Sequence, residues 1–245
     1  MCSQLNLSDN KIGGYYDMEE HKVIYTTEGP NAIADALLVH ASLTSLSVAG
    51  NGIVGDGAQQ LASTVLAKPT LEHFSGIPLK ELRADSLTTL DLSRKRLGVA
   101  EAIVLADLLR SVSTSLTSLD VRNNEITGDS ASQLSAAVVG NLKIETFNEI
   151  PIKQMRADTL TELNLHGMGM GVVGAMVVAG LVPVMASLTE LNIDGNDLGE
   201  NGALAIASAI KSASSLALQK LVVPSPHEKN EALKAACASK NVELV

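Results

Sequence analysis

The stretch Leu116-Thr-Ser-Leu-Asp-Val-Arg-Asn-Asn124-Glu-Ile126 decides the architecture of the chain. Its aliphatic residues and its second asparagine follow the spacing L-x-x-L-x-L-x-x-N-x-L, with valine and isoleucine in two leucine places. The same spacing recurs, complete or with substitutions, at residues 2–12, 43–53, 87–97, 160–170 and 188–198. A motif that returns this often predicts a repeat protein, in which one supersecondary unit is used many times.

A longer period lies on top of the first one. The segment Leu71–Asp85 returns as Ile144–Asp158, and both copies keep a phenylalanine, an isoleucine–proline pair and an Arg-Ala-Asp ending. Each copy opens a short unit of 16 residues, whereas the full units that begin at residues 43, 87, 116 and 160 have 28 to 29 residues. The short units leave no room for a helix, so we expect them to turn without one.

The physical role of each position in a full unit follows from its residue type. Alternating leucines predict a short strand with one face in the core. The asparagine side chain supplies hydrogen bonds to backbone groups where the chain leaves the strand. Apolar residues at helical spacing, such as Ala58, Leu61, Ala62 and Val65, then predict a returning helix. One unit cannot bury its apolar face alone, so the units stack.

These features resemble the leucine-rich repeat family, and in particular its ribonuclease-inhibitor-like class and the long arrays of unicellular algae and protists. The resemblance covers residues 1–245. It implies an α/β right-handed solenoid, or horseshoe, with a parallel sheet on the concave face and helices on the convex face. Members of the class serve as protein-binding scaffolds. The short units depart from the class pattern, as do Lys95 and Met168, which replace the usual asparagine.

We expect a single domain over residues 1–245, built from about nine units. A hairpin-like insertion occupies residues 14–27, and a more polar helix with a short strand forms a cap over residues 224–245. At the other end the first repeat begins at residue 2, with Cys2 in the place of the first leucine. Either the chain continues upstream or a partner covers this strand edge.

Composition excludes several classes of protein. The net charge of −9 and the pI near 5.0 argue against nucleic acid as a partner. Two cysteines are too few for a disulfide framework, and no secretory signal precedes the repeats. We therefore expect an intracellular and cytoplasmic protein, unless an upstream targeting segment directs it to an organelle. We expect neither a membrane span nor a small-molecule ligand.

The insertion holds all three tyrosines of the chain, Tyr15, Tyr16 and Tyr25. Polar residues between two apolar runs predict a hairpin that stands off the repeats. Tyrosine is favoured at interfaces, because it offers a large contact area and a polar tip. The alternative is that the tyrosines fold down on the neighbouring repeats.

The stretch Gly167–Ser187 carries no charged residue, although its counterpart in the preceding super-repeat does. Its glycines and Pro183 argue against a membrane-spanning helix. Helical spacing places Val177, Leu181 and Val184 in an outward apolar stripe, and an exposed stripe of this kind marks a contact surface. The alternative is that neighbouring helices cover it.

The outward strand positions are mostly Ser, Thr, Asp and Asn, and acidic residues become more frequent among them toward the C-terminus. Arg122 and His166 depart from this pattern and are candidates for partner binding, against the alternative that both are solvated. Arg94, Lys95 and Arg96 form a basic loop, which we interpret as a solvated turn.

No catalytic constellation is visible, because the five histidines lie in different repeats without partners at a suitable spacing. Gly169, Gly171 and Gly174 spell GxGxxG between a strand and a helix, which is the context of a dinucleotide site. The repeat itself already explains that context, so we expect no cofactor and no metal.

The sequence therefore predicts a non-catalytic scaffold for protein–protein interaction, as an accessory subunit or adaptor in a larger assembly. The alternative is a regulator of an enzyme, of the GTPase-activator or inhibitor type, that binds through the concave face.

Overall fold

The structure is a computed structural model that describes residues 3–112 and 115–245. Cys2, which takes the place of the first leucine in the opening repeat, lies outside the described residues. The chain folds into two compact units. The first comprises the residues up to 88, 92–115 and 124–134, and the second comprises 89–91, 116–123 and 135–245.

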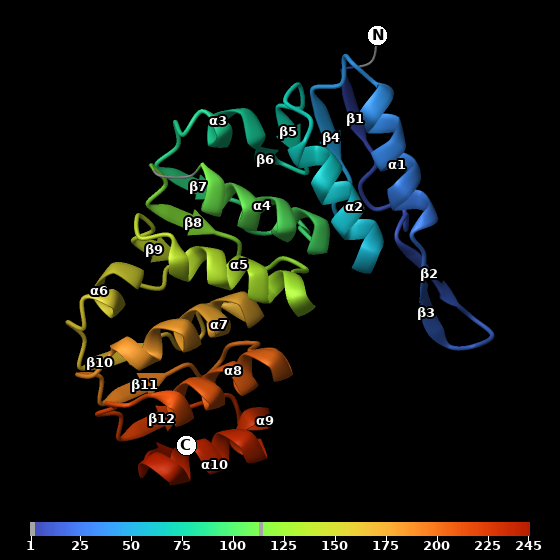
Figure 1. Ribbon diagram of the computed structural model, residues 1–245. Helices are drawn as coiled ribbons and strands as arrows, with labels where there is room; N and C mark the ends of the chain where they lie inside the picture. The colour runs from blue at the N-terminus through green and yellow to red at the C-terminus, as the bar shows by residue number, and fades with distance from the viewer. Residues whose placement is uncertain (1–2, 113–114) are drawn as a thin grey trace. The chain divides into compact units, whose positions relative to one another are not determined.

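In the first unit, strands alternate with helices that lie along one side of them (Figure 1). Its elements are β1 (Gln4–Asn6), β2 (Gly14–Asp17), β3 (Lys22–Tyr25), α1 (Glu28–Val39), β4 (Ser45–Ser47), α2 (Gly55–Leu66), β5 (His73–Phe74), β6 (Ile77–Pro78), α3 (Leu79–Arg83) and α4 (Val99–Ser111). Helix α5 (Gly128–Gly140) belongs in part to each unit.

The second unit repeats this alternation (Figure 1). Its elements are β7 (Thr89–Asp91), β8 (Ser118–Asp120), β9 (Thr146–Phe147), α6 (Ile152–Arg156), β10 (Glu162–Asn164), α7 (Gly171–Leu181), the 3₁₀ turn η1 (Val182–Val184), β11 (Glu190–Asn192), α8 (Gly199–Ser212), β12 (Lys220–Val222), α9 (Ser225–Glu228), α10 (Glu231–Lys240) and β13 (Glu243–Leu244).

The repeat strands pair parallel and in register, so that equivalent leucines lie side by side. Leu5 is opposite Leu46 in one sheet, and Leu163 is opposite Leu191 in another. The orders are β1-β4-β5-β6, β7-β8-β9 and β10-β11-β12-β13. The α/β fold with parallel strands between helices is therefore confirmed, but the described strands form several sheets instead of one continuous sheet.

The short units account for this division of the sheet. In each of them the strand is two residues long, and the chain then turns back on itself. Phe74 pairs antiparallel with Ile77, and Phe147 pairs with Ile150 in the same way. Ser75 and Asn148, which begin these turns, have φ values of 49° and 51°. The strands that follow the short units, β7 and β10, each begin a new sheet.

The expectation that the short units hold no helix is wrong. Each contains a five-residue helix, α3 or α6, directly after its isoleucine–proline pair. The chain reverses its direction between the phenylalanine and the isoleucine within so few residues that the remainder of the 16-residue unit can hold a short helix. An arginine in each short helix donates to carbonyl groups at the end of the preceding long helix and in the segment that follows it: Arg83 to Val65, Leu66 and Leu71, and Arg156 to Val138, Val139, Asn141 and Ile144. Helix ends need such partners.

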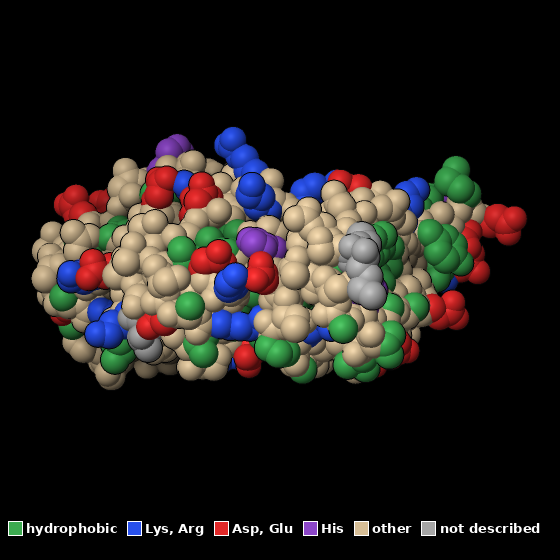
Figure 2. Space-filling model, turned by 90° about the horizontal axis from the view of Figure 1, so that it is seen from above, with side chains coloured by type: hydrophobic (Ala, Val, Ile, Leu, Met, Phe, Trp, Pro, Cys, Tyr) green, Lys and Arg blue, Asp and Glu red, His purple; other side chains and the backbone are tan. Residues whose placement is uncertain are grey.

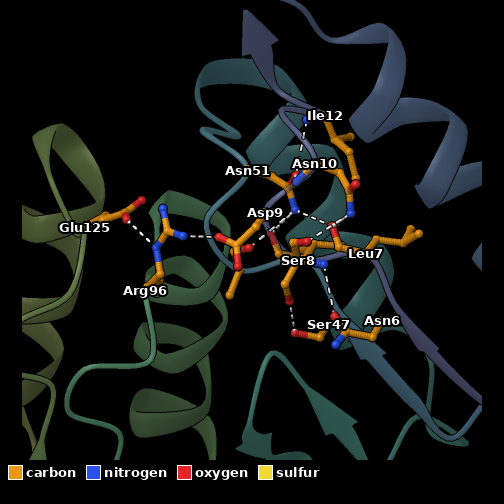
Figure 3. A network of polar contacts seen from close by, with 12 residues as sticks. Asn6, Leu7, Ser8, Asp9, Asn10, Ile12, Ser47, Asn51, Arg96 and Glu125 are labelled. Atoms are coloured by element: carbon orange, nitrogen blue, oxygen red, sulfur yellow. Dashed lines mark hydrogen bonds and ion pairs between the residues drawn. The ribbon is translucent and has the colours of Figure 1, made fainter.

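The expected role of the asparagine is confirmed, and it extends to the neighbouring repeat. Asn51 Oδ1 accepts from the backbone N–H groups of Asn10 at 2.7 Å and Ile12 at 3.2 Å (Figure 3). Its Nδ2 donates to the carbonyl oxygens of Leu7 and Val48, both at 2.7 Å. One buried side chain thus satisfies backbone groups of two successive turns, which would otherwise lie unpaired in the core.

The same arrangement recurs at the other full repeats. Asn124 accepts from the N–H groups of Lys95 and Leu97 and donates to Leu92. Asn196 accepts from the N–H of Met170 and donates to Leu165 and Ile193. The turns that contain Lys95 and Met168 therefore receive their hydrogen bonds from the asparagine of the following repeat, which explains why they fold without one of their own.

Replacing Asn196 with alanine should lower the free energy of unfolding by about 3 kcal/mol, because several buried backbone groups lose their partner at once. Urea unfolding followed by circular dichroism measures the loss. The matched control is Asn31→Ala at an exposed position of α1, which should change stability by less than about 0.5 kcal/mol. Equal losses in both variants would contradict the structural role of the asparagine.

Candidate protein-binding surfaces

The insertion forms an antiparallel hairpin of β2 and β3, in which Tyr16 lies opposite Val23 and Gly14 opposite Tyr25. Alternate residues of a strand point to opposite faces, so Tyr16, Val23 and Tyr25 share one face. Their exposed fractions are 50%, 49% and 59%, and that of Tyr15 on the other face is 53%. We call the face of Tyr16, Val23 and Tyr25 the tyrosine face. These side chains do not fold down into a core.

The hairpin tip is acidic. Asp17 Oδ1 accepts from the backbone N–H groups of Glu19 and Glu20 and so shapes the turn. Lys22 pairs with Glu20. In Figure 2, hydrophobic and acidic side chains gather together at the right-hand end, where Figure 1 places the hairpin. The hairpin therefore combines an exposed aromatic surface with a negatively charged tip.

The predicted apolar stripe on the helix of residues 171–181 is wrong. Val177 is 0% exposed and Leu181 is 3% exposed, and only Val184, in η1, is open at 53%. Helix α7 contacts α6 and α8, and Gly180 lies against Val139. Because helices cover its flanks, α7 is apolar on all sides, as a buried helix is expected to be. The loss of charge in this stretch reflects burial.

The two candidates on the outward strand positions have different surroundings. Arg122 donates to both carboxylate oxygens of Asp120, to Glu149 at 2.5 Å and to the carbonyl of Met168. Its side chain is only 21% exposed, and the bond to Asp120 raises the pKa of its guanidinium. Arg122 therefore connects successive repeats of its own chain. The imidazole of His166 is 58% exposed, with Nδ1 3.2 Å from Asp194.

A row of charges crosses the sheet of the second unit. In parallel register, Glu162 lies beside Glu190, Glu190 beside Lys220, and Lys220 beside Glu243. Lys220 Nζ contacts Glu190 at 2.9 Å. Lys220 thus offsets only part of the negative charge, so this row offers a partner an acidic surface.

The basic loop takes part in a polar network. Arg96 contacts Asp9 and donates to Glu125 at 3.1 Å (Figure 3). Arg94 and Lys95 are exposed.

The glycines of the GxGxxG segment have structural roles. Gly169 and Gly171 have φ values of 64° and 62°, in the region that favours glycine. A Cβ on Gly174 would lie 2.7 Å from the Cβ of Met170 and 3.3 Å from Ile150. The turn and the close packing of α7 therefore require these residues.

Glu101 is a buried acid that the sequence analysis did not single out. Its side chain accepts from Ser75 Oγ at 2.7 Å and from the N–H of Gly98 at 3.0 Å. Ser75 Oγ in turn accepts from the N–H of Val48. Burial raises the pKa of the Glu101 carboxyl group. The only signal in the sequence was its replacement by Gly174 in the second super-repeat.

That replacement has a partner. The counterpart of Ser75 is Asn148, whose Oδ1 accepts from the N–H of Val121 and whose Nδ2 donates to the carbonyl of Met170. The longer asparagine reaches the next repeat directly, whereas the short serine needs the glutamate to extend it. The pair Ser75 and Glu101 in one copy and the pair Asn148 and Gly174 in the other thus make equivalent connections between repeats. Glu101 therefore has a structural role.

The raised pKa of Glu101 predicts a pH dependence of stability. A raised folded-state pKa means that charging the group opposes folding, so its cost is present at neutral pH and disappears as pH falls to the unfolded-state pKa of about 4.3. In Glu101→Gln, the uncharged amide can accept from the N–H of Gly98 with its oxygen and donate to Ser75 Oγ with its NH2 group. The stability of this variant relative to the parent should therefore be highest at neutral pH and decline on acidification.

Urea unfolding between neutral and acidic pH tests this difference. Glu200, which is exposed in the first turn of α8, provides the matched control Glu200→Gln. A stability difference for Glu101→Gln that does not change with pH would contradict the buried, protonation-sensitive carboxyl group.

Among residues 3–112 and 115–245, no three side chains of His, Cys, Asp and Glu gather into a group that could hold a metal ion. None of the described helices has the length and apolar character needed to cross a membrane.

Comparison with known proteins bears on the repeats. The "Leucine Rich repeat" family model matches residues 39–62, 112–135 and 184–207. Comparison with curated protein sequences gives no match. Among solved structures, the chain resembles a Caenorhabditis elegans tropomodulin C-terminal domain with 16% identity, over 86% of this chain and 95% of that one. The TM-score of 0.25 is too low to bear on fold or function. The family model thus finds three leucine-rich repeats in the chain, one in each pair of full repeats.

Proposed function

We propose that this chain is a non-catalytic scaffold that binds another protein through its hairpin, as an accessory subunit or adaptor of a larger assembly. Leucine-rich repeat domains generally mediate protein–protein interaction, which supports the class of function. We infer from the resemblance of the repeats to the family that they form a right-handed solenoid, with the strands on the concave face and the helices on the convex face. Such an array serves as a rigid frame, and the hairpin is the element that projects from it.

The distribution of exposed apolar side chains carries the proposal. Among the described residues, the large hydrophobic side chains that are open to solvent are concentrated before residue 40: Leu5, Tyr15, Tyr16, Met18, Val23, Tyr25, Leu38 and Val39. The rest of the chain contributes only Leu142, Val184, Leu204 and Val245. Tyr15, Tyr16, Met18, Val23 and Tyr25 all lie on the hairpin. Clustered apolar exposure of this kind marks a contact surface, whereas scattered single residues do not.

The chemistry of the hairpin indicates the kind of partner. Exposed tyrosines fill apolar pockets with little loss of side-chain entropy and leave a hydroxyl for hydrogen bonding. Asp17, Glu19 and Glu20 at the tip favour a partner with basic residues at the rim of such a pocket. We therefore expect a protein surface with an apolar hollow and a positively charged border.

Affinity purification of the tagged chain from its native cells, with quantitative mass spectrometry, tests this function. The intact chain should recover one partner in stoichiometric amount. Replacing Tyr16 and Tyr25 with serine should reduce that recovery by at least about tenfold, since interface tyrosines carry much of the binding energy. The matched control is Leu142→Ser, which changes an isolated side chain that is 80% exposed. Recovery that is the same in both variants would contradict binding through the hairpin.

The second candidate function is regulation of an enzyme, which this chain would bind through its concave strands. The observation in its favour is the acidic row of Glu162, Glu190 and Glu243 around Lys220. Adding the purified chain to the recovered partner, if that is an enzyme, and measuring turnover distinguishes the two. A regulator changes turnover and loses its effect with Glu162→Lys and Glu190→Lys, whereas an adaptor leaves turnover unchanged.

A further inference from the structure

The turn that follows β7 is basic, whereas its counterpart in the second super-repeat carries no charge. Residues 94–96 read Arg-Lys-Arg, and the equivalent residues 167–169 read Gly-Met-Gly. The two arginines have φ values of 57° and 56°, and the two glycines have 65° and 64°. Glycine adopts this left-handed conformation without steric cost, whereas a residue with a Cβ does not. The backbone of the turn therefore favours glycine at both arginine positions, and its shape does not explain the charge.

Arg96 has a structural role that offsets this cost (Figure 3). Its guanidinium contacts Asp9 and donates to Glu125 at 3.1 Å. Its carbonyl oxygen accepts from the N–H of Gly50 at 3.1 Å, and a Cβ on Gly50 would lie 2.9 Å from Cζ of Arg96. The guanidinium thus passes over this glycine. Arg96 therefore joins the turns that follow β1, β4, β7 and β8 into one surface.

Lys11, Arg94 and Lys95 have no such role. All three residues are exposed, and none of their side chains forms an ion pair with another residue that the structure describes. The two acidic residues of these turns, Asp9 and Glu125, both pair with Arg96. The three cations are therefore left without an acidic partner, although the chain as a whole has a net charge of −9. We call Lys11, Arg94 and Lys95 the basic edge.

The basic edge adjoins the hairpin. Lys11 lies in the turn that leads into β2, and the N–H of Thr26, directly after β3, donates to the carbonyl oxygen of Gly13 at 2.9 Å. The hairpin therefore leaves the repeats at the end of the turn that carries Lys11. Because the tip of the hairpin is acidic, one continuous segment presents charges of opposite sign. Such a pattern fixes the orientation of a partner with the complementary charges.

We propose that the basic edge binds an acidic segment of the protein that contacts the tyrosine face. The ligands are carboxylate groups of Asp or Glu. The planar guanidinium of Arg94 takes a carboxylate with two hydrogen bonds, and the ammonium groups of Lys95 and Lys11 attract further carboxylates. This inference rests on the proposed protein-binding function and adds to it a second contact of opposite charge. It goes beyond the solvated turn that the sequence analysis expects here.

A fluorescein-labelled oligoglutamate peptide is the first probe. At low ionic strength it should bind the full chain saturably, with a Kd below about 1 mM by fluorescence anisotropy, although the net charge of the chain repels it. Arg94→Gly with Lys95→Met copies the turn of residues 167–169 and should weaken binding at least about tenfold. The control Lys143→Met with Lys229→Met removes the same charge at exposed positions and should leave the Kd unchanged. Equal effects of the two variants would overturn the inference.

Urea unfolding of Arg94→Gly separates a binding role of this side chain from a structural one. Glycine suits the φ of 57° at this position, so the urea midpoint of the variant should equal or exceed that of the parent chain. Loss of peptide binding together with an undiminished midpoint supports a residue that is retained for its charge. A clear fall in the midpoint would assign Arg94 a structural role and overturn the inference.

Recovery of the partner by affinity purification links the two contacts. Arg94→Gly with Lys95→Met should reduce it, and more so at low than at high salt, because salt screens exposed charges. If this variant leaves recovery unchanged while Tyr16 and Tyr25 remain necessary, only the basic edge is wrong. If neither pair affects recovery, the proposed function is wrong as well. A DNA oligonucleotide that binds the basic edge more tightly than the peptide would assign it to nucleic acid and also overturn the inference.

Discussion

The fold depends on satisfying backbone groups at the turns that follow each strand. Successive repeats meet at these turns, and the backbone N–H and C=O groups that face the neighbouring repeat need partners within the chain. The side chains of Asn51, Asn124 and Asn196 each hydrogen-bond to the preceding turn. The asparagine is therefore an element of the junction between repeats, and it fixes the register in which the leucines of successive strands meet.

The two short units show how the chain varies this solution. Ser75 reaches the next helix only through Glu101, whereas Asn148 reaches the carbonyl of Met170 by itself. Where asparagine performs the task, the helix position becomes Gly174 and packs closely on Met170 and Ile150. The same short units interrupt the sheet by turning after two strand residues. The short units thus determine three features: which backbone groups near them are hydrogen-bonded, how closely the next helix packs, and where each sheet ends.

Much of this arrangement could be predicted from the sequence, because periodicity reports directly on short-range structure. The leucine spacing predicted the parallel strands, and Ala58, Leu61, Ala62 and Val65 form the buried side of α2 as expected. The helices α3 and α6 were missed, because the length of a unit does not show how few residues its turn requires. The exposure of Val177 and Leu181 was wrong, because helical spacing places a residue on a face without revealing which helices cover that face.

The candidate surfaces were harder to predict for the same reason. Composition located the tyrosines in the insertion, but the exposure of Tyr16 and Tyr25 depends on a hairpin that leaves the repeats. Arg122 differs from its neighbours in sequence, yet its bonds to Asp120 and Glu149 turn it inward to its own chain.

The most direct test of the account is hydrogen–deuterium exchange on the chain with and without its recovered partner. The account predicts that backbone amides of residues 14–27 become protected, because the partner covers the tyrosine face. Protection confined to β10, β11 and β12, with residues 14–27 exchanging as in the free chain, would contradict it and would assign binding to the strands.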